Sequence, residues 1–283
     1  MNEFGINRKY KDRLFIFLFG NEEYKENTLS LYNAVNGTDY TDVNDVTFYT
    51  IGDVIYIKMK NDVAVLFDSR LSLWEHQSSF NPNMPVRGLM YFGKMYDKFI
   101  KEQGKNIYGE SLVRIPTPKY CVFYNGEKEL PAISKMKLSD AFMIPDESGE
   151  FEWTATMYNL LSDENVGLLN SCKVLADYCT FTGLVKSNLK SGMEINEAVD
   201  EAVKCCISNG TLEIYLLRHR AEVMDMVLTE FDEEVFRKGT EEDILIKAVR
   251  NLMKNMNLSE EEAIKALGIP ESEHQKYLDR LTS

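Results

Sequence analysis

Apolar runs in the first part of the chain predict a β-sheet. Residues 46–77 hold the runs VTFYTI and VIYIKM, and then the stretch NDVAVLFDSRLSLWEHQ. In that stretch Asp68-Ser69 separates two apolar segments, and a polar pair between β-rich runs is typical of a hairpin turn. A turn at this point places Asp62 directly opposite Glu75, on the same face of the sheet.

In much of the remaining chain, apolar residues recur at the spacing of a helix. Helices are predicted from about residue 22 and over residues 84–103, where Pro85 suits the first turn. The run YCVFY predicts another strand, and the segments MKLSDAFMI and FEWTATMYNL are candidates for further strands. From about residue 160, apolar residues recur at i, i+3 and i+4, which predicts a helical second half.

This order of elements predicts an α/β protein with a mixed sheet flanked by helices and a helical C-terminal region. We expect a core over residues 1–160, a helical region packed on it over 161–238, and a small helical unit over 239–283. In the last unit, Ser259 and Glu262 form a capping box, and Pro270 starts another helix. Such a pair of short helices fits either a hairpin used for packing or self-association, or a helix-turn-helix.

Composition narrows the class of protein. The chain has 283 residues, of which 44% are hydrophobic and 27% charged, as in ordinary globular proteins. It has no apolar run of the roughly 18 residues that a membrane span needs, and its charged start lacks a signal-peptide core, so a cytoplasmic protein without membrane contact is expected. The five cysteines form no CxxC pair, which favours reduced thiols over a zinc site.

The predicted hairpin brings together groups that can bind a cation. Glu75 and Gln77 share a face because they are two residues apart on a strand, and Asp62 joins them across the hairpin. Opposed like charges destabilise a sheet, and a divalent cation such as Mg²⁺ or Mn²⁺ would offset that repulsion. The alternative is that both acids lie at strand ends and are screened by solvent.

A basic stripe follows on the predicted helix. Arg87, Lys94, Lys98 and Lys101 fall at helical spacing on one face, while apolar residues occupy another face. The net charge of −13 argues against broad attraction to nucleic acid, but a local basic ridge beside a metal site is suited to a phosphate backbone. A solvated helix face explains the same spacing.

Several segments carry a resemblance to a known family. They are LFGNEEYKENTLSLYNAVNG, VIYIKMKND, LSLWEHQSSFNPNMPVRGLMYFGKMY, IPTPKYCVFYNG, KLSDAF and HRAEVMDMVLTEFDEE. Together with Asp62…Glu75-x-Gln77 they resemble the Rpn-type group of recombination-promoting nucleases and transposases, within the PD-(D/E)XK nuclease superfamily. The resemblance covers about residues 12–235, while the last 45 residues or so match less distinctively.

The resemblance implies a PD-(D/E)XK nuclease-like core and a Mg²⁺-dependent DNA endonuclease, with Mn²⁺ as a substitute metal. Asp62 and Glu75 match the motif acids and would bind the metal. Glu26, or else Glu22 or Glu23, would complete the site from the first helix. Gln77 takes the position that is lysine in most of the superfamily, and it would position the attacking water.

Two departures from the superfamily pattern bear on activity. Asn61 replaces the motif proline, and Gln77 lacks the positive charge of the usual lysine, so it supplies only neutral hydrogen bonds. A catalytically inactive nuclease fold that binds nucleic acid or protein is therefore the alternative function. Neither the DNA preference nor the assembly of the chain into a homo-oligomer can be read from the sequence.

Overall fold

The computed structural model describes residues 9–49, 62–146, 148–224 and 259–268, together with seven single residues between 246 and 278. The chain divides into two compact units. One unit is Arg8–Val227, and all described residues from Ile246 onward belong to the other. The predicted strand VIYIKM, Asn61 and Pro270 lie outside the described residues.

The larger unit is built on a six-stranded mixed sheet with the order β1-β2-β3-β4-β6-β5. The strand pairs β3–β4 and β4–β6 are parallel, and the other three pairs are antiparallel. The strands are β1 (Thr47–Phe48), β2 (Asp62–Phe67), β3 (Arg70–Gln77), β4 (Thr117–Tyr124), β5 (Ile133–Lys137) and β6 (Thr154–Asn159). The predicted α/β class with a mixed sheet flanked by helices is therefore confirmed.

The β2–β3 hairpin has the predicted register. Asp68 and Ser69 form the turn with φ angles of 46° and 56°, so both central residues adopt the left-handed conformation of the turn type that fits a two-residue hairpin. Asp62 pairs with Glu75 across the hairpin, and Leu66 pairs with Leu71. The hairpin thereby fixes the face on which both acids lie.

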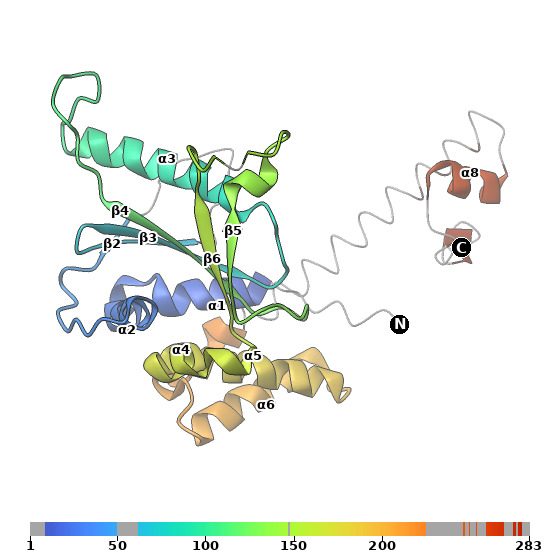
Figure 1. The fold of residues 1–283 in the computed structure, drawn as a ribbon. Coiled ribbons are helices and arrows are strands. Elements are labelled where there is room, and N and C mark those ends of the chain that lie inside the picture. Colours follow the sequence, from blue (N-terminus) through green and yellow to red (C-terminus); the bar gives the residue numbers. More distant parts are fainter. Residues whose placement is uncertain are drawn as a thin grey trace. The chain divides into compact units, whose positions relative to one another are not determined.

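Helices cover both faces of the sheet (Figure 1). On one face lies α3 (Met84–Glu102), and on the other lie α1 (Lys9–Phe19) and α2 (Lys25–Asn36). A further helical layer packs beyond α1 and α2, and consists of α4 (Val166–Ser171), α5 (Lys173–Lys190), α6 (Ile195–Ser208) and the helical residues 213–224. No helix in the described part of the chain is both long enough and apolar enough to cross a membrane.

The described part of the larger unit also contains three short 3-10 helices, at Glu22–Tyr24, Leu138–Ala141 and Asp163–Asn165. In the other unit, α8 (Glu260–Ala266) begins with the predicted capping box, because Ser259 and Glu262 each bond the backbone of the other. Ala263 and Ile264 of this helix pack with Tyr277 in a small apolar cluster.

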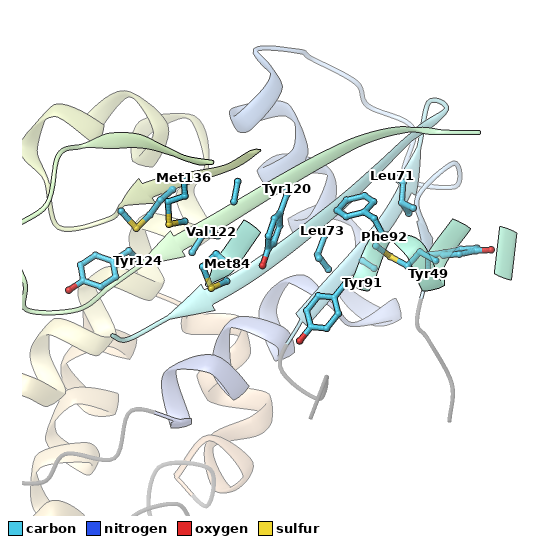
Figure 2. Close-up of a cluster of buried hydrophobic side chains, with 14 residues drawn as sticks. Tyr49, Leu71, Leu73, Met84, Tyr91, Phe92, Tyr120, Val122, Tyr124 and Met136 are labelled. Carbon is cyan, nitrogen blue, oxygen red and sulfur yellow. The ribbon is translucent and has the colours of Figure 1, made fainter. Parts of the chain in front are cut away.

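An apolar layer between α3 and the sheet positions the site, as Figure 2 shows. It includes Leu71, Leu73, Phe92, Met95, Tyr120 and Val122. Gly88 allows α3 to lie close to β4, because a Cβ atom added at Gly88 would be only 2.5 Å from the ring of Tyr120. The first turns of α3 are thus held against the strand that neighbours β3.

Candidate functional site

Two acidic side chains meet at the open end of the β2–β3 hairpin, beneath α3. Glu75 lies opposite Asp62 in the register, and its side chain is 0% exposed although it is a carboxylate. Asp62 is partly exposed as a residue, but its Oδ2 atom is buried. The alternative of a solvent-screened strand end is therefore wrong for Glu75. A buried acidic pair needs a compensating partner.

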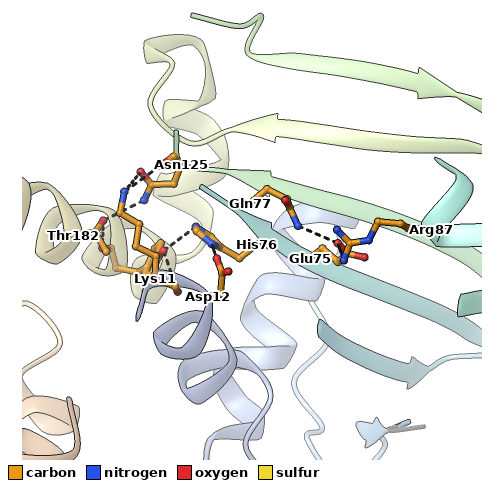
Figure 3. Close-up of polar contacts among 9 residues, drawn as sticks. Lys11, Asp12, Glu75, His76, Gln77, Arg87, Asn125 and Thr182 are labelled. Carbon is orange, nitrogen blue, oxygen red and sulfur yellow. Dashed lines mark hydrogen bonds and ion pairs between the residues drawn. The ribbon is translucent and has the colours of Figure 1, made fainter. Parts of the chain in front are cut away.

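Glu75 has three hydrogen-bonding or ionic partners. The Tyr120 hydroxyl donates to Oε1 at 2.6 Å. Arg87 contacts Oε2 through Nη2 at 3.0 Å, and the Gln77 amide donates to the same oxygen at 3.2 Å (Figure 3). The structure thus brings Glu75 together with Gln77 and Arg87, which were predicted as site residues. Tyr120 was not predicted, because its strand lies 45 residues from Glu75 in the sequence.

Asp62 is much less well satisfied. Its Oδ2 atom has no hydrogen-bond partner among the described residues. Burial is the main reason that the pKa of Asp62 is raised to about 8, and the charge of Glu75 contributes to that rise, while Arg87 and a hydrogen bond from the Tyr91 hydroxyl oppose it. Burial also raises the pKa of Glu75, against the opposing effect of Arg87. Burial thus makes both carboxyl groups harder to ionise, and once both are ionised a single guanidinium cannot neutralise them.

These residues fit a hard divalent cation. Mg²⁺ binds oxygen ligands and commonly takes one or two carboxylates, with water and substrate phosphates completing its shell. Asp62 and Glu75 supply two such carboxylates, and the unpartnered Oδ2 of Asp62 is a ready ligand. Within the described residues, no group of three or more His, Cys, Asp or Glu side chains is gathered closely enough to hold a metal ion. A cation here would accordingly rely on water and phosphate oxygens.

Glu26, the predicted third acid, lies on α2 and is exposed. The neighbouring residues Asn27 and Thr28 are buried, and they donate hydrogen bonds to the carbonyl oxygens of Leu18 and Phe19 at the end of α1. The side of α2 that carries Asn27 and Thr28 therefore faces α1, and Glu26 does not lie on that side. No described contact joins Glu26 to Asp62 or Glu75, so its role as a ligand stays a prediction. Glu22 and Glu23, the other two candidates, are exposed as well.

A second polar cluster lies on the opposite side of β3 and was not predicted. His76 alternates to the face away from Glu75, where its Nδ1 atom lies 2.6 Å from Asp12 (Figure 3). The Nε2 atom of His76 lies 2.8 Å from the Tyr178 hydroxyl. His76 is 1% exposed, so this network ties α1, β3 and α5 together in the interior. The charge of Asp12 also raises the pKa of Asp62 and of Glu75.

The basic stripe on α3 is partly paired with acids of its own helix. Lys98 lies 3.7 Å from Glu102, and Lys101 lies 2.6 Å from Asp97. Lys98 also lies over the ring of Tyr49 at 4.6 Å. Lys94 is half-buried and occupies the same helix face two turns after Arg87, which itself contacts the site. The first residue of the predicted stripe, Arg87, therefore contacts the acidic pair through Glu75.

A comparison with protein-family models found no match, and comparisons with curated proteins and with solved structures found none either.

Proposed function

We propose that this chain is a PD-(D/E)XK-type nuclease that hydrolyses DNA phosphodiester bonds with Mg²⁺ or Mn²⁺. The observation that carries the proposal is a buried pair of opposed carboxylates, one of which keeps an unpartnered oxygen, beside a guanidinium. The mixed sheet with helices on both faces agrees with the fold that the resemblance implies.

Each residue has a distinct task in this proposal. Asp62 and Glu75 bind the cation, which when present supplies Lewis-acid stabilisation and an activated water for attack on phosphorus. Gln77 holds Glu75 through its amide nitrogen at 3.2 Å and so orients that ligand. Tyr120 fixes the other oxygen of Glu75. Arg87 and Lys94 bind phosphate oxygens of the DNA backbone, a task for which arginine forks are well suited.

The second candidate is an inactive nuclease fold that binds DNA without cutting it. One observation favours it: Glu75 already has three partners, which satisfy its carboxylate without a metal ion. The absence of a lysine at position 77 also favours an inactive fold, because removal of one charge-stabilising donor commonly costs on the order of 10²–10³ in rate.

A plasmid-nicking assay separates the two candidates. The wild-type protein should nick DNA with Mg²⁺ or Mn²⁺ and not with EDTA, and Asp62→Asn and Glu75→Gln should abolish nicking. Asp39→Asn is a matched control, because Asp39 is exposed and no described contact joins it to Asp62 or Glu75. Circular dichroism of each variant verifies that the fold is retained.

Two results would contradict the proposal. If wild-type protein binds DNA but does not nick it at any metal concentration, the inactive fold is the better account. If Asp62→Asn nicks as fast as wild type, the acidic pair is not the active site.

A further inference from the structure

The cation that faces the acidic pair in this structure belongs to the protein itself. The Nη2 atom of Arg87 lies 3.0 Å from Oε2 of Glu75. The Arg87 side chain is 32% exposed, whereas that of Glu75 is fully buried. A long, flexible and partly exposed group therefore neutralises a group that cannot leave the interior. Of the two partners, Arg87 is the one that can move.

Once Asp62 is ionised, the charges at the site do not balance with Arg87 alone. Asp62 and Glu75 supply two negative charges when both are ionised, and Arg87 supplies one positive charge. Asp62 keeps a buried oxygen without a hydrogen-bond partner among the described residues. A divalent cation would balance both carboxylates, whereas the guanidinium contacts only one of them.

The guanidinium and a metal ion compete for the same oxygen. Oε2 of Glu75 already accepts from Arg87 and from Gln77. A cation bound between Asp62 and Glu75 would lie next to the guanidinium, and like charges at this separation repel strongly in a buried setting. Arg87 has another partner to retain, because its Nη2 atom also lies 3.2 Å from the Tyr91 hydroxyl, one turn further along α3.

We propose that Arg87 is an exchangeable counter-ion, which neutralises Glu75 in the metal-free protein and withdraws from it when a divalent cation binds. The withdrawn guanidinium is then free to bind a phosphate of the DNA, so cation binding prepares the protein for its substrate. This inference rests on the proposed function, because it takes the acidic pair to be a metal site.

Calorimetric titration with Mn²⁺, without DNA, tests the exchange. Arg87→Gln should bind Mn²⁺ about tenfold more tightly than wild type, within the range typical of coupled binding events, because the ion no longer displaces a guanidinium. Lys94→Gln is the matched control. It removes the same charge from the same face of α3 without touching Glu75, so its Mn²⁺ affinity should stay close to that of wild type.

A measurement on the wild-type protein covers the case in which Arg87→Gln does not fold. The side-chain Nε–H signal of Arg87 in a ¹⁵N-labelled sample, assigned with Arg87→Lys, should shift when Mg²⁺ is added. An unchanged signal in a protein that binds Mg²⁺ would overturn the inference.

The possible titration results are distinguishable. If wild type and Arg87→Gln bind Mn²⁺ equally, or the variant binds more weakly, the exchange is wrong while the metal site stands. If neither protein binds Mn²⁺, the proposed function fails, and the exchange fails with it.

Discussion

Replacement of Asp62 by asparagine should change how the stability of the metal-free protein depends on pH. Burial, with the help of the Glu75 charge, raises the pKa of Asp62 to about 8, whereas an aspartate in an unfolded chain titrates near 3.9. Between about pH 4 and pH 8 the folded protein therefore binds more protons than the unfolded chain. The free energy of unfolding must fall as pH rises through this window.

The size of this effect follows from the shift. A pKa change of roughly four units corresponds to about 5–6 kcal/mol, at about 1.4 kcal/mol per unit. This contribution is fully present below pH 4 and is lost by about pH 8. The asparagine side chain of the variant carries no charge at any pH in this range and resembles the protonated acid in shape. Asp62→Asn should accordingly match wild type near pH 4 and exceed it in stability by several kcal/mol at pH 8.

Urea unfolding in EDTA, from pH 4 to pH 8.5, measures the difference. Tryptophan fluorescence reports on the correct unit, since the chain has two tryptophans, Trp74 and Trp153, and both lie within Arg8–Val227. Asp39→Asn controls for the loss of an exposed carboxylate and should follow the wild-type curve. Parallel curves for wild type and Asp62→Asn over the whole range would refute the account of Asp62 as a strained buried acid.

Two further predictions concern α3. Gly88→Ala should lower the free energy of unfolding by about 1–3 kcal/mol, the usual cost of an overpacked core, because the added Cβ would meet the Tyr120 ring at 2.5 Å. Gly93→Ala in the same helix meets nothing within 4 Å and should be stabilising by roughly 0.5–1 kcal/mol; equal effects in urea unfolding would contradict this contrast. Replacement of both Lys94 and Lys98 by glutamine should weaken DNA binding equally for unrelated sequences. It should also reduce the slope of log K against log salt by about one per lost phosphate contact in fluorescence anisotropy, and an unchanged slope would show that the stripe is only a solvated helix face.

The hairpin shows how much of the site local sequence can predict. Side chains alternate along a strand, and a two-residue turn fixes the register, so the pairing of Asp62 with Glu75 follows from the turn at Asp68-Ser69. The burial of these two acids does not follow from the hairpin. Glu75 is buried because β4 pairs with the full length of β3 and Tyr120 lies over its carboxylate, and that contact spans 45 residues of sequence.

The prediction for Glu26 came from the family resemblance, which implies an acid on the first helix. Position on a helix gives the spacing of side chains, but the direction in which each one points depends on how the helix packs. The buried amide of Asn27 and the hydroxyl of Thr28 dock α2 on the end of α1, and Glu26 lies on the exposed side as a result. The contact of Asp12 with His76 could not be predicted from the sequence either. Asp12 lies 64 residues from His76, and no spacing rule links the two.

The lysine stripe and the net negative charge of the chain have opposite effects on the DNA binding that we propose. A net charge of −13 repels a phosphate backbone at long range, so affinity must come from cations close to the site. The pairs Lys98–Glu102 and Lys101–Asp97 lie on the helix surface, where such pairs contribute at most about 1 kcal/mol and yield readily to a phosphate. Arg87 differs, because its partner Glu75 is buried and cannot be screened by water. In the exchange that we propose, Arg87 contributes to DNA binding only when another cation neutralises Glu75. On this reasoning, the affinity of the protein for DNA should depend on divalent metal more strongly than the surface lysines alone would require.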